Sequence, residues 1–133
     1  MESQGIKNFN EQLRERTIAL AVKVYQLFKL KQSLIINRSM VDQVLRSTTS
    51  VAANCRAATR ARSDAEFYAK ICIVVEECDE TQFWFDFFIR TGIVYKSETN
   101  EMLEEIEQLV KIFTSIKKKM KEKMAKQMKN SKI

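Results

Sequence analysis

The chain of 133 residues is 45% hydrophobic and 30% charged with a net charge of +6, a composition typical of one globular domain and not of a disordered segment. It has no proline and only two glycines, so few tight turns are available and we expect a small number of long elements. Histidine is absent, which excludes the commonest general base and metal ligand, and charges interrupt every apolar run before it reaches the length of a membrane-spanning helix.

The first helical pattern covers residues 9–31. Apolar side chains recur on one stripe when successive residues turn by about 100°, as expected for a helix that faces a core. This stripe consists of Leu13, Leu20, Val24, Leu27 and Phe28. A second apolar group, Ile18, Val22 and Tyr25, lies nearly opposite. Since a bundle helix buries only one face, the second group predicts contact with another copy of the chain.

Residues 39–61 form the second predicted helix, which begins at the capping pair Ser39 and Asp42. Its core stripe consists of Val41, Val44, Thr48, Val51, Ala52 and Cys55. The opposite side carries the small residues Ser50, Ala53 and Ala57, which would permit close approach of another backbone. The connection before this helix contains Leu34, Ile35 and Ile36, which are candidates to pack under the end of a bundle.

The third helix has the clearest boundaries and is predicted over residues 64–91. Ser63 and Glu66 have the spacing of a capping box, and Gly92 supplies a stop. The core stripe of this helix consists of Phe67, Ile71, Val74, Cys78, Phe85 and Ile89. Because the end of the helix is apolar nearly all round, we expect Phe83 and Phe87 to contact another copy.

The fourth helix is predicted over residues 98–124, with acids in its first turns and lysines in its last, as the helix dipole favours. Its core stripe consists of Met102, Ile106, Leu109, Phe113, Ile116 and Met120. Residues 117–133 hold eight lysines and one glutamate, whereas the rest of the chain has 15 basic and 16 acidic residues. We expect residues 127–133 to form a frayed basic tail.

Four helices of this length with short connections predict an all-α, up-and-down antiparallel four-helix bundle, with residues 1–126 as a single domain. The spare apolar faces of the first and third helices predict assembly into a homo-oligomer. Cys55, Cys72 and Cys78 lie in apolar helical patterns without the spacing of a zinc site, so we interpret them as reduced thiols. Reduced thiols and a polar N-terminus without a signal peptide favour a cytoplasmic protein with no membrane partner.

The only candidate for acid–base or metal chemistry is the acidic cluster Glu76, Glu77, Asp79 and Glu80. Glu76 and Glu80 share one face at helical spacing, where like charges repel. The favoured interpretation is a bridge between helices, in which one of these two glutamates faces Arg46 or Arg56. Without histidine, a glycine-rich phosphate loop or a nucleophile motif, the sequence predicts a protein that is not an enzyme and binds no cofactor or metal.

The basic side chains have two interpretations, because they could bind phosphates with salt-sensitive affinity or only offset nearby acids. The candidate nucleic-acid-binding residues are Arg46, Arg56, Arg60, Arg62, Lys117, Lys118, Lys119 and Lys121, and Arg38 is a further arginine of this kind. No aromatic residue lies between the lysines, so stacking on the bases of a single strand is not supported there.

The stretch 46–54, which reads Arg-Ser-Thr-Thr-Ser-Val-Ala-Ala-Asn, resembles a known family of four-helix-bundle proteins encoded in intervening sequences of 23S ribosomal RNA genes. Relatives of that family include the accessory variability protein of diversity-generating retroelements. The residues that match its motifs are Ser50, Val51, Ala53, Asn54, Arg62, Ser63, Glu66, Phe67 and Glu80. Ala52 stands at the family's proline and Ala57-Ala58 at its Glu-Gly, so no role of that missing glutamate carries over.

The resemblance implies a bundle that assembles into a ring-like homo-oligomer, often a pentamer, with a basic surface that contacts nucleic acid or a reverse transcriptase. Two functions therefore stay open at the level of the sequence. One is an oligomeric scaffold that binds RNA or DNA. The other is a protein–protein adaptor, for example for a reverse transcriptase, that does not bind nucleic acid itself.

Overall fold

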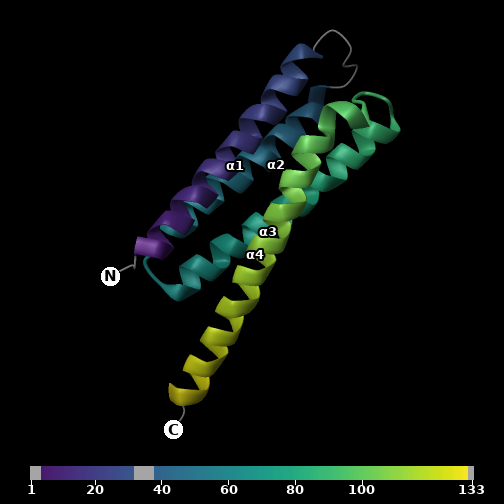
Figure 1. The fold of residues 1–133 in the computed structure, drawn as a ribbon. Helices are drawn as coiled ribbons and strands as arrows, with labels where there is room; N and C mark the ends of the chain where they lie inside the picture. Colours follow the sequence, from purple (N-terminus) through teal and green to yellow (C-terminus); the bar gives the residue numbers. More distant parts are fainter. Residues whose placement is uncertain (1–3, 32–37, 132–133) are drawn as a thin grey trace.

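The structure is a computed structural model that describes residues 4–31 and 38–131. Its helices are α1 (Gln4–Leu30), α2 (Arg38–Thr59), α3 (Asp64–Arg90) and α4 (Lys96–Ser131), and these described residues contain no strand. Successive helices run in opposite directions, with α1 beside α2 and α4 crossing α3 (Figure 1). The predicted all-α, up-and-down four-helix bundle is confirmed. None of the four described helices combines the length and the apolar character needed to cross a membrane.

Two helix boundaries differ clearly from the prediction. Helix α1 begins at Gln4, before the predicted start at residue 9, and the Gln4 side chain donates a hydrogen bond to Asn8. Helix α4 continues to Ser131, so the tail predicted to fray from residue 127 is helical that far. The reason is that lysine, methionine, alanine and glutamine are all strong helix formers, although they leave no apolar period to detect. The predicted packing of Leu34, Ile35 and Ile36 lies outside the described residues.

The core contains most residues of the predicted apolar stripes of all four helices. Ala52, Phe67, Ile89, Ile116 and Met120 are only partly buried, because they lie at the edges of those stripes. The stripes missed Phe88, which has no solvent exposure. The ring centroid of Phe88 lies 5.2 Å from that of Phe28 in α1. In a segment that is apolar all round, the helical period alone does not select which phenylalanine enters the core.

The turn between α3 and α4 contains Gly92, the predicted stop, which follows the C-cap residue Thr91 and has a φ angle of +77° that favours glycine. The backbone N–H of Val94 returns to the carbonyl oxygen of Phe88, and the Val94 side chain is buried. The carboxylate of Glu98 then accepts the backbone N–H of Tyr95 and binds the Lys31 ammonium, each at 2.9 Å. This buried lysine fastens the end of α1 to the start of α4.

Candidate nucleic-acid and self-association surfaces

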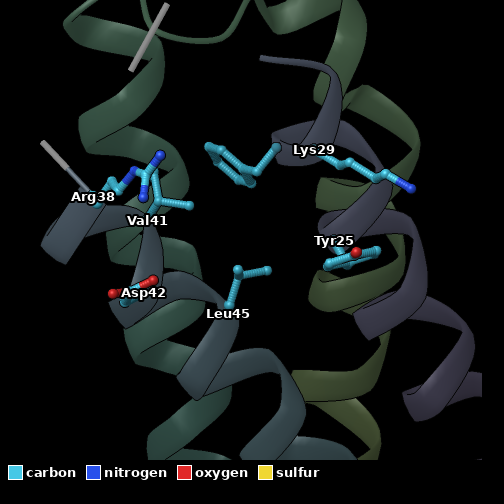
Figure 2. A pocket seen from close by; sticks show the side chains of 7 residues that line it. Tyr25, Lys29, Arg38, Val41, Asp42 and Leu45 are labelled. Atoms are coloured by element: carbon cyan, nitrogen blue, oxygen red, sulfur yellow. The ribbon is translucent and has the colours of Figure 1, made fainter. Parts of the chain in front are cut away.

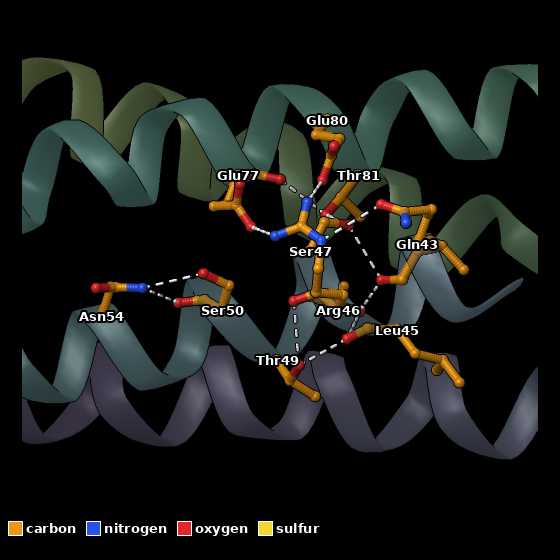
Figure 3. Close-up of polar contacts among 12 residues, drawn as sticks. Gln43, Leu45, Arg46, Ser47, Thr49, Ser50, Asn54, Glu77, Glu80 and Thr81 are labelled. Carbon is orange, nitrogen blue, oxygen red and sulfur yellow. Dashed lines mark hydrogen bonds and ion pairs between the residues drawn. The ribbon is translucent and has the colours of Figure 1, made fainter. Parts of the chain in front are cut away.

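Arg46 joins α2 to α3 (Figure 3). One guanidinium nitrogen lies 2.8 Å from a Glu77 carboxylate oxygen, and the second terminal nitrogen binds Glu80. The Gln43 side chain accepts a third N–H at 3.4 Å. The predicted bridge between helices is therefore present between Arg46 and Glu80, and Glu77 is a second acidic partner that the sequence did not predict. This arginine already shares its donors among three protein groups, which leaves fewer of them for a phosphate.

Below this bridge, Ser47 of α2 and Thr81 of α3 form a buried hydrogen bond of 2.8 Å between their hydroxyl groups. Thr81 also donates to the backbone carbonyl of Glu77 at 2.9 Å, which completes a short chain of donors and acceptors. The sequence did not single out either residue. The helical period could have predicted that Ser47 is buried, because it lies three residues after Val44 and four before Val51 on the core stripe of α2.

Two family-motif residues of α2, Ser50 and Asn54, form hydrogen bonds with each other on the outer side of the helix. The Asn54 side-chain amide donates to the Ser50 carbonyl oxygen at 2.9 Å and lies 3.0 Å from the Ser50 hydroxyl (Figure 3). Ala53 is exposed beside them. These contacts are all within one helix, so they shape the surface of α2 without joining it to a neighbour.

Ser63 is the N-cap of α3, and its hydroxyl accepts the backbone N–H of Glu66 at 3.1 Å. The Glu66 carboxylate lies 3.7 Å from the Arg62 guanidinium, so the predicted capping box uses its serine half in this arrangement. The Phe67 backbone N–H donates to the Ser63 carbonyl oxygen, and the Phe67 ring is partly buried. Three motif residues therefore define the first turn of α3.

The lysine-rich end of α4 projects beyond the other helices (Figure 1). Lys118, Lys119 and Lys121 are exposed, whereas Lys117 is half-buried. Nearer the end, the Lys123 ammonium lies 3.4 Å from the Asp64 carboxylate, and Gln127 donates to the same group. Thus a single acid at the start of α3 holds this segment, and most of its positive charge faces solvent.

A groove of about 650 Å³ runs between α1 and α2. We call it the α1–α2 groove and define it by Ile18, Ala52, Ala53, Arg56 and Arg60. Its α1 edge also carries Glu11, Arg14 and Glu15. The Ile18 side chain is 52% exposed, and the apolar stripe continues along α1 through the exposed Val22 and Tyr25. These three predicted interface residues are accessible on the surface of a single copy.

The second exposed apolar region lies on α3. Phe83 is 58% exposed, and its ring centroid lies 5.1 Å from that of Trp84 and 6.5 Å from that of Phe87. Phe87 is only partly buried. Around Phe83 the exposed acids are Glu76, Asp79 and Asp86, of which Asp86 pairs with Arg90. The predicted interface residues of α3 therefore sit within an acidic surface.

A smaller pocket of about 200 Å³ lies between the end of α1 and the start of α2 (Figure 2). Its lining consists of Tyr25, Phe28, Lys29, Arg38, Val41, Asp42 and Leu45. Figure 2 shows the Lys29 side chain extending away from Arg38, so the two cations do not converge.

The acidic residues of α3 do not form a metal centre in the part of the chain that the structure describes, where no group of three potential ligands comes together. Glu80 is engaged by Arg46, and Glu76 is exposed. Cys55 and Cys78 are buried and Cys72 is half-buried, all three as free thiols.

Residues 10–115 match a family model described as 23S rRNA-intervening sequence protein. The chain belongs to this family. A similar solved structure is a protein of unknown function from the S23 ribosomal protein family of Bacteroides thetaiotaomicron. The two share 29% sequence identity with a TM-score of 0.74, over 82% of this chain and 97% of that one. No curated protein matches the sequence.

Membership of the 23S rRNA-intervening sequence family confirms the resemblance seen in the motifs of α2 and α3. All motif residues from Ser50 to Glu80 lie inside the matched region. The match ends at residue 115, before the lysine-rich end of α4 begins. The lysine-rich end of α4 therefore lies outside the matched region.

Proposed function

We propose that this family member is a non-enzymatic cytoplasmic scaffold that self-associates and binds the phosphate backbone of RNA or DNA through the end of α4. The observation that carries the proposal is a face of four exposed lysines, Lys118, Lys119, Lys126 and Lys129. With 3.6 residues per helical turn, they lie within about 100° of one another around the axis. Among the described residues, none of the four forms an ion pair.

The lysine face suits a duplex backbone better than individual bases. From Lys118 to Lys129 the helix rises about 16 Å, at 1.5 Å per residue. This length spans about five base pairs of duplex DNA, at 3.4 Å per step. Since no aromatic residue accompanies the lysines, binding gains its free energy from counterion release and carries little sequence preference.

The test is the salt dependence of binding, measured by fluorescence anisotropy with a labelled DNA duplex between 50 and 200 mM salt, a range over which about six phosphate contacts cost about 10³-fold in affinity. We expect the logarithm of the association constant to fall linearly with the logarithm of salt concentration. In the variant with Lys118, Lys119, Lys126 and Lys129 all changed to Gln, we expect weaker binding and a slope reduced by up to about 3.6, at about 0.9 per phosphate contact.

A matched control changes four exposed lysines away from this face, Lys7, Lys23, Lys29 and Lys96, to Gln. This control removes the same charge and should keep most of the affinity and slope. Equal losses in both variants would show that binding follows net charge and not the α4 face. Absence of binding by the wild-type protein at low salt would remove the nucleic-acid function altogether.

The second candidate is a protein–protein adaptor without nucleic-acid binding, which the exposed apolar residues Ile18, Val22 and Tyr25 of α1 support. The two candidates differ in their dependence on the lysines. An adaptor should still capture a protein partner in the four-lysine variant. That variant is a cleaner probe than removal of residues 117–133, because truncation would also delete the contacts of Lys123 and Gln127 with Asp64.

A further inference from the structure

We infer that the α1–α2 groove of one copy holds the acidic side of α3 from a second copy. We call that second surface the α3 face and define it by Glu76, Asp79 and Phe83. The inference rests on the self-association part of the proposed function and names the two surfaces that meet. It follows from complementary charge, exposed apolar area and matching spacing along two helices.

The α3 face offers one aromatic side chain and two unpaired acids. Glu76, Asp79 and Phe83 stand at positions i, i+3 and i+7, which places them on one side of the helix. All three are exposed. Within residues 4–31 and 38–131, neither Glu76 nor Asp79 forms an ion pair, whereas Glu77 and Glu80 on the adjacent side bind Arg46.

The α1–α2 groove offers the opposite features. Ala52 and Ala53 have small side chains and leave an open floor beside Ile18. Arg56 and Arg60 are exposed on the α2 edge, and neither forms an ion pair with any residue that the structure describes. The acids of the groove, Glu11 and Glu15, stand on the α1 edge. An incoming acidic helix is therefore favoured along the α2 edge.

The spacings of the two surfaces match when the helices run antiparallel. Arg56 follows Ala53 by three residues along α2, and Arg60, the first residue after this helix, follows it by seven. Along α3, Asp79 and Glu76 precede Phe83 by four and seven residues. If the rise of 1.5 Å per residue continues to Arg60, the charges lie about 5 Å and about 10 Å from the apolar anchor on both surfaces.

One arrangement therefore satisfies three contacts together, with Phe83 over Ala53, Asp79 near Arg56 and Glu76 near Arg60. The aromatic anchor loses its solvent exposure while charged pairs form at its side, the usual division of roles in an interface. Because the two surfaces differ, each copy has one of each, and association is head-to-tail. Such contacts close into a ring when the rotation between copies allows it.

The test is charge exchange followed by light scattering at micromolar concentration. The groove variant is Arg56→Glu with Arg60→Glu, and the face variant is Glu76→Arg with Asp79→Arg. We expect the wild type to form oligomers and each variant to fall to the 15.6 kDa of a single chain, because like charges then oppose. All four changes in one chain should restore the wild-type mass, since the charges attract again.

The matched control is Glu104→Arg with Glu107→Arg, which reverses two exposed acids at the same i, i+3 spacing on α4. This control should keep the wild-type mass, and circular dichroism should show the helical content of every variant unchanged. A docking of groove on groove predicts instead that the face variant keeps its mass. That result, a monomeric wild type, or a folded but monomeric four-change protein would each overturn the inference.

The same samples separate this inference from the nucleic-acid function. If the wild type is monomeric but binds the DNA duplex with the expected salt dependence, the docking is wrong and the α4 function stands. If assembly follows the charge exchange but no duplex binds at low salt, the docking stands and the α4 function is wrong.

Discussion

At the scale of single residues, Cys78 shows how burial controls chemistry in this protein. Its side chain has no solvent exposure, and burial, followed by the proximity of Cys55 and Glu77, raises the pKa of the Cys78 thiol from 9.0 to about 12. Burial also raises the pKa of the Cys55 thiol. Both groups are therefore neutral core thiols at physiological pH and weak nucleophiles.

The raised pKa of Cys78 predicts a loss of stability in alkali. The unfolded thiol ionises above pH 9.0 while the folded thiol stays neutral to about pH 12, so the unfolded state is favoured as pH rises through this interval. Between pH 8 and pH 10.5 we expect a loss of about 2 kcal/mol from this group, at about 1.4 kcal/mol per pH unit. Urea unfolding at both pH values measures it.

The comparison variant is Cys78→Ala, which should be less stable at pH 8 but should lose less on going to pH 10.5. Val44→Ala controls for the cavity, because it removes fully buried apolar atoms and no thiol. It should keep the alkaline loss of the wild type. Equal losses in Cys78→Ala and the wild type would contradict the assignment to this thiol.

At the scale of elements, the start of α3 depends on the side chain of Ser63. Its backbone is extended at φ −154° and ψ 161°, and its hydroxyl satisfies the Glu66 N–H that the helix leaves unpaired. We expect Ser63→Ala to lower the free energy of unfolding by about 1 kcal/mol. Denaturant titration checks this value.

Ser63→Asp provides the contrast, because a carboxylate accepts the same N–H and also suits the positive end of the helix dipole. This variant should unfold at the denaturant concentration of the wild type or slightly above it. A stability as low as that of Ser63→Ala would show that the hydroxyl acts in some way other than capping.

The helices could be predicted from the sequence because each carries a clear period or a local start and stop signal, such as the one at Ser63. Local signals do not report what happens where several elements meet. The burial of Phe88 against Phe28, and the pairing of Lys31 with Glu98, depend on how helices distant in sequence lie together. For the same reason the sequence predicted a bridge from Arg46 to α3 but missed Glu77 as one partner.

At the scale of the whole molecule, the exposed apolar side chains explain why the sequence predicted more than one copy. Ile18, Tyr25 and Phe83 each keep about half of their surface in water, and they belong to two separate regions. Scattered apolar side chains are normal on a monomer, but rows of them beside unpaired charges are typical of interaction surfaces. The family match supports the fold. Self-association is proposed from the exposed apolar side chains and the unpaired charges.

Self-association predicts that thermal stability depends on protein concentration. Assembly favours the folded state by mass action, so the unfolding midpoint should rise with concentration in the wild type. In the variant Glu76→Arg with Asp79→Arg the midpoint should stay constant. Scanning calorimetry over a hundredfold concentration range measures both, and a constant midpoint for the wild type would argue against association.

The buried hydrogen bond between Ser47 and Thr81 has a consequence for how α2 and α3 choose their alignment. Two apolar helix surfaces can shift along each other at a small cost in free energy, because one aliphatic side chain packs nearly as well as another. Two buried hydroxyls facing each other cannot, since a slip of one turn, about 5.4 Å, would break the hydrogen bond between them. The same slip would carry Arg46 away from its acids. The hydrogen bond between Ser47 and Thr81 therefore selects the native alignment of α2 and α3. Its main effect is to disfavour other alignments, and its contribution to the free energy of unfolding is secondary.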